Sequence, residues 1–333
     1  MTNSSPLLWT QPGWLETAKN WIKVELNRLG INLVGPFEQP HIRPWSTVIR
    51  VPTSAGNLYF KAVAPELAHE AALTRYLSRW RTDCMPQVLS ADSEQGWLLM
   101  ADGGMRLRKI LQAESDLRHW TTLLPIYAEL QLDLSGRLDE LLGMGVPDRR
   151  LAILPAQFED LLTHTGVLGL DRPEGLSSAE YRQLKDSTGL LARWCEQLAA
   201  FDIPESLDHG DFHDGNIFVH QGRYTFFDWG DSSITHPFFT LRTAFVSLEN
   251  SLGLDEDSPW FEQLRIRYLE RWLGYETKER LAAAFKLSQR LSPLTAALRW
   301  LSALSRVDEP GRSDYAAAIP SLLREFLSVK EEP

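Results

Sequence analysis

Two short polar motifs are the residues of this chain best suited to chemistry. The first, HGDFHDGN, spans residues 209–216, and the second, FFDWG, spans residues 226–230. At this spacing, Asp211 can accept or orient the proton of an attacking hydroxyl. Asn216 and Asp228 can supply oxygen ligands to magnesium ions that bridge nucleotide phosphates. The pattern therefore predicts phosphoryl transfer from a nucleotide to a hydroxyl group.

The segment between the two motifs is expected to bring them together. Residues 217–219 and 224–227 are short apolar runs typical of strands, and Gln221-Gly222 between them is typical of a turn. Such a hairpin would carry Asp228 back beside Asn216.

Other interpretations of these residues remain open. His209 is expected to brace the loop and take no part in the chemistry. His213 and Asp214 could support their neighbours or be solvated loop residues. A metal-dependent hydrolase using His209, Asp211, His213 and Asp228 as ligands is one alternative, and a catalytically idle nucleotide-binding protein is another.

Transfer from a nucleotide also requires residues that hold its phosphates. Residues 45–51 and 57–63 are rich in β-branched and aromatic side chains, with Pro and Gly between them, which predicts a hairpin. Lys61 interrupts the apolar second arm. It is either an edge-strand lysine that points to water or the strand lysine that contacts the nucleotide phosphates.

A helix carboxylate is the expected partner of this lysine. Residues 65–77 begin with proline, which favours a helix start. At helical spacing, Glu70 shares one face with Leu67, Leu73 and Leu77. Because an unpaired carboxylate on a packed face is costly, Lys61 is its natural partner. Glu66 is a weaker candidate, since the helix dipole alone explains an acid in the first turn.

Further nucleotide contacts are predicted nearby. Residues 85–90 and 96–104 are typical of strands, and the second would lead into a hinge at Met100 to Asp102 whose backbone binds adenine. A core strand followed by a turn is equally compatible. The loop 41–47 lacks glycine, so Ser46, Thr47 or backbone N–H groups would contact phosphate there.

Together these residues resemble the aminoglycoside phosphotransferase family, the kinase-like group that includes choline, homoserine and sugar kinases. The matching positions, in the family order, are Phe60-Lys61, Glu70, His209-Gly-Asp211, Asn216 and Asp228-Trp-Gly230. The resemblance implies an α+β, protein-kinase-like two-lobed fold, with a small antiparallel β lobe carrying one main helix and a larger, mostly helical lobe. It also implies ATP and Mg²⁺ as cofactors and a small-molecule hydroxyl acceptor such as an amino sugar, sugar or amino alcohol.

We expect residues 1–104 to form the nucleotide-binding lobe, with a leading helix at 14–29, and residues 105–333 to form the catalytic and acceptor-binding lobe. Beyond residue 107, strands are expected only around the catalytic hairpin. Helices are expected at 115–133, 155–165, 177–201, 238–252, 259–273, 278–291, 293–304 and 314–329.

Bulk composition limits the classes of function. The 333 residues contain 44 acidic and 34 basic side chains, which argues against a nucleic acid partner. Residues 1–105 are balanced in charge, so the acidic excess lies in the second predicted lobe. That excess would attract a cationic acceptor, although most of these residues are expected on solvated helix faces. The chain has only two cysteines, no apolar run of membrane-spanning length and no signal-peptide pattern. These features favour a cytoplasmic protein. Nothing in the sequence indicates an obligate protein partner.

Overall fold

In a computed structural model, which describes residues 8–255, 257–305, 307 and 309–330, the chain forms two compact units. The first comprises Met1–Arg106, Ile217–Gly230 and Arg306–Gly311, and the second comprises Leu107–Asn216, Asp231–Ser305 and Arg312–Pro333. The first unit contains the segment predicted as the nucleotide-binding lobe, and the hairpin at 217–230 also belongs to it. The functional roles assigned to the two lobes stay predictions.

The centre of the first unit is a five-stranded antiparallel sheet with the strand order β1-β2-β3-β5-β4. Its strands are β1 (Glu38–Ile42), β2 (Ser46–Thr53), β3 (Gly56–Val63), β4 (Val88–Asp92) and β5 (Trp97–Ala101). Its helical elements are η1 (Leu8–Thr10), α1 (Trp14–Leu29), η2 (Pro65–Leu67) and α2 (His69–Trp80). A second antiparallel sheet joins β6 (Met105–Arg106), β8 (Ile217–His220) and β9 (Arg223–Phe226).

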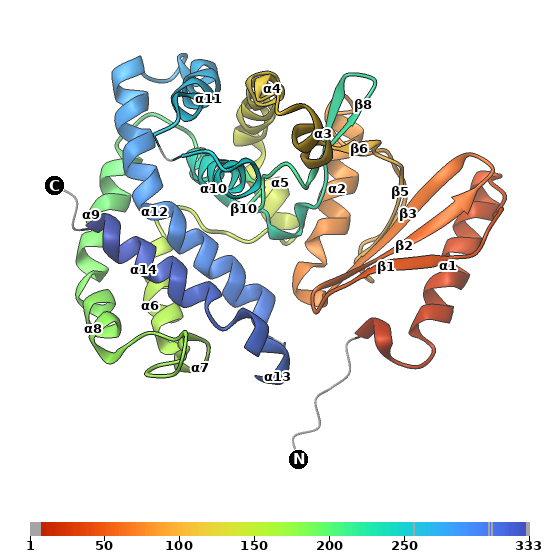
Figure 1. The fold of residues 1–333 in the computed structure, drawn as a ribbon, viewed down its shortest axis with the longest axis horizontal. Helices are drawn as coiled ribbons and strands as arrows, with labels where there is room; N and C mark the ends of the chain where they lie inside the picture. The colour runs from red at the N-terminus through yellow and green to blue at the C-terminus, as the bar shows by residue number, and fades with distance from the viewer. Residues whose placement is uncertain (1–7, 256, 306, 308, 331–333) are drawn as a thin grey trace. The chain divides into compact units, whose positions relative to one another are not determined.

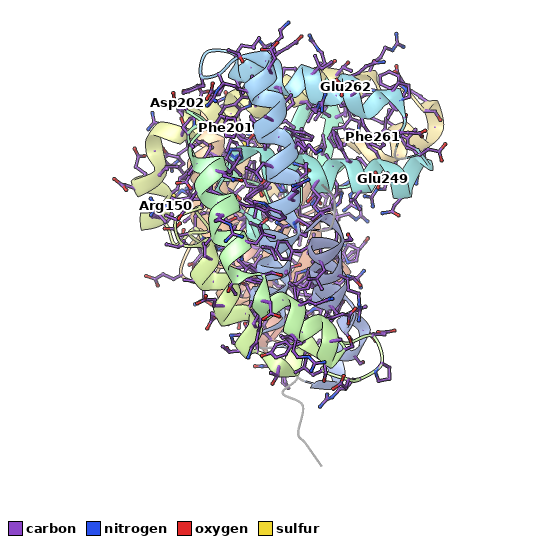
Figure 2. The ribbon with its side chains drawn as sticks, turned by 90° about the vertical axis from the view of Figure 1, so that its left-hand side faces the viewer. Arg150, Phe201, Asp202, Glu249, Phe261 and Glu262 are labelled. Atoms are coloured by element: carbon purple, nitrogen blue, oxygen red, sulfur yellow. The ribbon has the colours of Figure 1, made fainter. Side chains whose placement is uncertain are left out.

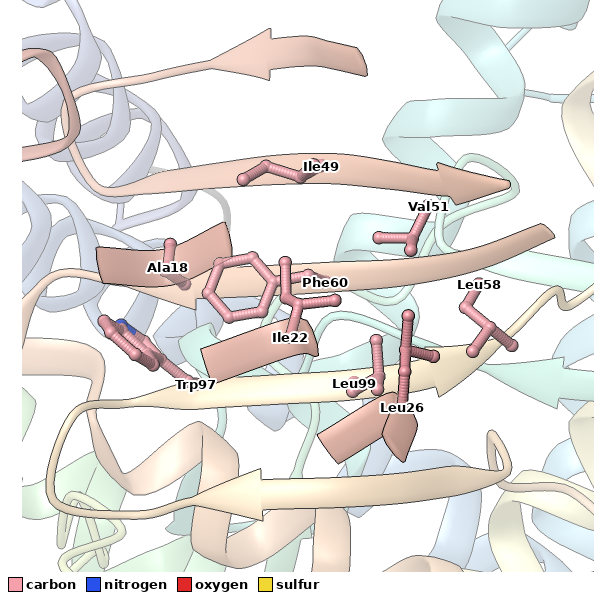
Figure 3. Packing of buried hydrophobic residues seen from close by; sticks show 10 residues of the cluster. Ala18, Ile22, Leu26, Ile49, Val51, Leu58, Phe60, Trp97 and Leu99 are labelled. Atoms are coloured by element: carbon pink, nitrogen blue, oxygen red, sulfur yellow. The ribbon is translucent and has the colours of Figure 1, made fainter. Parts of the chain in front are cut away.

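One face of the five-stranded sheet packs against α1 (Figures 1 and 3). The apolar residues of this layer are Ala18, Ile22 and Leu26 from α1, and Ile49, Val51, Leu58, Phe60, Ala62, Trp97 and Leu99 from the strands. The spacing of the helix residues is the helical periodicity that predicted residues 14–29. Gly30 then ends α1 in the left-handed conformation (φ 68°), which glycine adopts without strain.

The opposite face of the sheet packs against α2. Ala71 of α2 clusters with Leu98 and Met100 of β5, and Phe227 packs against the same cluster. Because side chains alternate along a strand, Phe60 on the α1 face places Lys61 on the α2 face. β3 lies between β2 and β5, so the interpretation of Lys61 as an edge-strand residue is wrong.

The second unit is mainly helical (Figures 1 and 2). Its helices are α3 (Leu107–Glu114), α4 (Arg118–Leu134), α5 (Leu138–Gly143), α6 (Leu154–Thr163), α7 (Thr165–Leu168), α8 (Ser178–Asp186), α9 (Thr188–Ala199), α10 (Thr240–Leu252), α11 (Pro259–Leu269), α12 (Lys278–Leu304) and α14 (Ala318–Lys330). Short 3₁₀ turns are η3 (Ser135–Arg137), η4 (Trp229–Asp231, which begins in the first unit), η5 (Pro237–Phe239), η6 (Glu270–Trp272) and η7 (Ser313–Tyr315). The short helix α13 (Glu309–Arg312) belongs to the first unit except for its last residue.

Aromatic contacts join several of these helices. In Figure 2, Phe201 follows α9, and the Arg280 guanidinium lies 4.8 Å from the centre of its ring. Phe261 of α11, labelled in the same view, packs against Phe245 of α10 with ring centres 5.0 Å apart. α12 also packs along α14, and α11 along α4.

Three local expectations for this unit were wrong. The helix expected at 177–201 is divided at Ser187, a buried residue whose hydroxyl donates to the Gln183 carbonyl at 2.5 Å. The helices expected on either side of Pro293 form one helix, α12. A two-stranded antiparallel sheet, β7 (Ser206–Asp208) with β10 (Ser233–Thr235), was not predicted, because three-residue strands show no periodicity.

Candidate active site

In the first unit, Lys61 lies between two carboxylates. Its Nζ lies 2.6 Å from Oε1 of Glu70 and 2.5 Å from Oδ1 of Asp228. Lys61 is 7% exposed and Glu70 is 1% exposed, whereas the Asp228 side chain is 52% exposed. Burial alone would lower the pKa of Lys61, but Asp228 and Glu70 together raise it above its ordinary value, so the ammonium stays charged. The structure thus confirms the predicted Lys61–Glu70 ion pair.

The elements around Asp228 fix its position. In the β8–β9 hairpin, Ile217 pairs with Phe226, and Gln221 and Gly222 form the turn with positive φ (51° and 78°). Asp228 itself has φ 67°, an uncommon conformation for a residue with a side chain and one often found at functional sites.

The two residues after Asp228 pack tightly. The Trp229 ring is fully buried and its Nε1 donates to the Phe226 carbonyl at 3.0 Å. A Cβ on Gly230 would lie 3.0 Å from Oε2 of Glu70. Trp229 therefore anchors the segment, and Gly230, which has no side chain, leaves room for the Glu70 carboxylate that pairs with Lys61.

In the second unit, the loop around Asp211 is held by hydrogen bonds. Asn216 Nδ2 donates to the Asp211 carboxylate oxygen Oδ2 (2.9 Å) and to its backbone carbonyl (3.0 Å). The backbone N–H of Asp211 donates to Nδ1 of the buried His209 (3.3 Å), and the backbone N–H of His209 donates to the Tyr127 hydroxyl (2.9 Å). These contacts agree with the expected role of His209 as a brace.

Glycine is required within this loop. Gly210 has φ 78°, and a Cβ there would lie 2.2 Å from the Asp231 carbonyl oxygen and 2.8 Å from Cδ of Arg299. The close packing places the Arg299 side chain against the loop. No feature of the sequence had pointed to Arg299.

The Asp211 carboxylate is ionised far below neutral pH. Burial opposes ionisation, but the hydrogen bond from His213 and the positive charge of Arg299 hold the pKa of Asp211 well below its usual range. His213 Nε2 lies 3.1 Å from Oδ2 of Asp211. Asp211 is therefore a weak base whose charge does not change across the physiological range.

The hydrogen bonds around His213 also define its protonation. The Asp211 and Asp214 carboxylates raise the pKa of the ring, but two donors face Nδ1: the Gly215 N–H at 2.9 Å and Arg108 Nη2 at 3.1 Å. Because both would repel a proton on Nδ1, this geometry favours the neutral ring with its proton on Nε2, pointing at Asp211.

Asp214 lies behind His213 and is fully buried at its side chain. Nε and Nη2 of Arg108 donate to its Oδ1 at 2.9 and 2.7 Å, and the hydroxyls of Ser247 and Ser251 donate at 3.1 and 3.3 Å. Although burial raises it, Arg108 and Ser247 lower the pKa of Asp214 to about 2. Asp214 is therefore a structural ion-pair residue of the loop, and the interpretation of it as solvated is wrong.

The remaining predicted nucleotide contacts lie in the first unit. Ser46 begins β2, pairs with Val63 and is buried. Met100 lies in β5 opposite Tyr59 and is 6% exposed. Asp102 is exposed, and its Oδ1 accepts the N–H of Gly104 at 2.9 Å, which shapes the turn after β5. Their contacts with a nucleotide stay predictions.

Within the described ranges, no group of three or more His, Cys, Asp or Glu side chains could hold a metal ion. His209, Asp211 and His213 of the second unit therefore do not form such a group. Of the helices that the structure describes, none is both long and apolar enough to cross a membrane.

Solved structures of small-molecule kinases have a similar fold. A choline/ethanolamine kinase family protein from Mesorhizobium loti aligns with a TM-score of 0.61 at 15% identity, covering 95% of this chain and 96% of its own. An ADP-bound aminoglycoside phosphotransferase, APH(2'')-Ib, aligns at 0.57 and 14%, covering 94% and 98%. The GDP complex of an aminoglycoside 2'-phosphotransferase-IIIa aligns at 0.57 and 13%, covering 94% and 98%.

The fold is similar to that of small-molecule kinases, and its first unit contains a buried lysine paired with two carboxylates. A family model described as the phosphotransferase enzyme family matches residues 47–284. The chain belongs to this phosphotransferase family, as the sequence motifs predicted. No sequence among the curated proteins is significantly similar to it.

Proposed function

We propose that this protein transfers the γ-phosphate of ATP to a hydroxyl group of a small molecule. The observation that carries the proposal is the buried Lys61 ammonium held between Glu70 and Asp228. A cation fixed in this way can bind phosphate oxygens without having to be ordered first. We place the backbone of Met100 and Asp102 at the adenine and Ser46 at the phosphates.

Asp211 is the proposed catalytic base. Both side-chain donors near it, Asn216 and His213, bind its Oδ2. Among the residues that the structure describes, none donates a hydrogen bond to Oδ1, so this oxygen can accept the acceptor hydroxyl. With its low pKa, Asp211 acts mainly by orienting that hydroxyl, and it takes the proton once phosphate transfer has made the oxygen acidic.

Asn216 and Asp228 are the proposed magnesium ligands, and their donor atoms fit a hard cation. The Asn216 amide nitrogen is turned to Asp211, which leaves its amide oxygen for a metal. Asp228 offers a half-exposed carboxylate. When bound, magnesium would neutralise charge on the phosphate oxygens, and two protein ligands suffice because it also coordinates phosphates and water.

The acceptor is the least specified part of the proposal. The acidic excess of the second predicted lobe favours a cationic alcohol, such as an amino sugar or an amino alcohol. A cytoplasmic location is proposed on the two free, buried cysteines, Cys84 and Cys195, whose thiol pKa values burial raises to about 12.

The test is acceptor-dependent nucleotide consumption. Purified protein with Mg²⁺ and either ATP or GTP is screened against aminoglycosides, choline, ethanolamine, homoserine and sugars. We expect turnover with one acceptor class, and a fall of roughly 10²–10⁴-fold in Asp211→Asn with nucleotide affinity nearly unchanged. Turnover of Asp211→Asn within a few-fold of the wild type would overturn the role of Asp211.

A further inference from the structure

A pocket in the first unit lies apart from Lys61 and its two carboxylate partners. It has a volume of about 370 Å³ and is formed by α1, α2 and β4. Its polar lining comprises Glu25, Arg28, Arg75, Ser78, Arg79 and Ser90. Three of these six residues are arginines, in a chain with an acidic net charge of −10.

Two of the arginines have no acidic partner. Arg75 and Arg79 are exposed on α2, and in the described part of the chain neither side chain makes a hydrogen bond or an ion pair. They are four residues apart, so their like charges repel each other along one face of the helix. An anion between them would relieve that repulsion.

The third arginine is already neutralised. Oε2 of Glu25 accepts hydrogen bonds from Nε of Arg28 at 2.9 Å and from the Ser90 hydroxyl at 2.6 Å. Nη2 of Arg28 donates to the same hydroxyl at 2.9 Å. The Ser90 hydrogen bond is the main cause that lowers the pKa of Glu25, so this carboxylate is ionised and balances Arg28. The pocket therefore keeps two uncompensated positive charges, those of Arg75 and Arg79.

We propose that this pocket binds the phosphate group of a small molecule through Arg75 and Arg79. Guanidinium groups bind phosphate oxygens in pairs of parallel hydrogen bonds. The volume lies within the range typical of small-molecule sites, so it accommodates a phosphate monoester as well as free phosphate. Glu70 also lies on α2 but is buried on its opposite face, about half a turn round from the two arginines. A ligand held there is thus distinct from a nucleotide bound at Lys61.

The test compares two double variants of the full chain, in the absence of nucleotide. Arg75→Ala with Arg79→Ala removes the proposed site. Arg182→Ala with Arg193→Ala, two exposed arginines of α8 and α9, removes the same net charge elsewhere. Calorimetric titrations use inorganic phosphate and glucose 6-phosphate as probes, and thermal unfolding verifies that both variants are folded.

We expect the Arg75/Arg79 variant to lose at least tenfold in affinity, while the Arg182/Arg193 variant binds like the wild type. A tighter wild-type affinity for the ester than for phosphate would assign the site to a phosphate ester, and the reverse would assign it to free phosphate. Failure of the wild type to bind either probe, or equal affinities in the two variants, would overturn the proposal. Since binding is read without turnover, this result is independent of the proposed function.

Discussion

Replacing Lys61 by methionine tests the contribution of the ion pair alone, because methionine keeps the apolar part of the side chain and removes the ammonium. The Lys61 and Glu70 side chains are 9% and 2% exposed, so the change leaves a deeply buried carboxylate without its ammonium partner. Breaking a buried pair in this way costs roughly 3–5 kcal/mol. For a unit of this size, that loss lowers the midpoint of thermal unfolding by about 10 °C. Asp228 adds little, since its half-exposed carboxylate can turn to water.

The loss of stability in the Lys61→Met variant is expected to depend on pH. Without the ammonium, burial raises the pKa of Glu70 in the folded state above its value in the unfolded chain. A carboxyl of this kind binds more protons when folded, so the stability of the variant rises as pH falls. The difference from the wild type should therefore be largest near pH 8 and shrink toward pH 5.

Thermal and urea unfolding of the full chain between pH 5 and pH 8, without nucleotide, measure both effects. Lys23→Met is the matched control, because Lys23 is an exposed lysine of α1 in the same unit. Adding Glu70→Leu to Lys61→Met should recover most of the lost stability, since it removes the stranded carboxylate. The reasoning fails if Lys61→Met is as stable as Lys23→Met at pH 8, or if its loss does not change with pH.

Three further predictions follow from the site and the fold. Asp228→Ala should abolish magnesium-dependent nucleotide binding, and Asn216→Ala should weaken it less because a neutral ligand is lost; magnesium titrations unchanged in both variants would exclude this metal site. Asp214→Asn should lower the free energy of unfolding by about 2 kcal/mol at pH 7. The pKa of Asp214 is lowered to about 2, so this difference should persist down to about pH 4 and vanish toward pH 2, as urea unfolding would show. Ser292→Ala should cost about 1 kcal/mol, because its hydroxyl donates to the carbonyl that the helix proline cannot reach, and a cost near zero would contradict this.

Two kinds of sequence pattern gave correct predictions: helical periodicity with an end signal, and charged residues on apolar faces. Residues 14–29 have helical periodicity and end at a glycine, and α1 has these bounds. Lys61 and Glu70 were paired because a charge on each of two apolar faces needs a partner, and the structure contains that ion pair. Because an unpaired charge in a protein core is very costly, this pairing could be predicted without knowing the topology of the fold.

Contacts between distant polar side chains were not predictable in this way. Arg108 binds Asp214 across 106 residues, and Arg299 packs on Gly210, but each arginine lies in a helix where a solvated position is the ordinary expectation. Periodicity also failed at two helix boundaries. Ser187 divides a continuous apolar pattern, while the helix continues through Pro293 because the Ser292 hydroxyl donates to the Gln289 carbonyl, at 3.1 Å, that the proline leaves without its N–H.

The charges in the first unit give a physical reason for the metal dependence that we propose. Lys61, Glu70 and Asp228 together carry one net negative charge, and a nucleotide triphosphate is strongly anionic. Without a cation, the exposed Asp228 carboxylate repels the phosphates and competes with them for the ammonium. Asp228→Ala should therefore improve nucleotide binding in EDTA while abolishing the gain that magnesium gives. If this variant instead loses affinity equally with and without magnesium, then Asp228 serves the fold of the segment and not the metal.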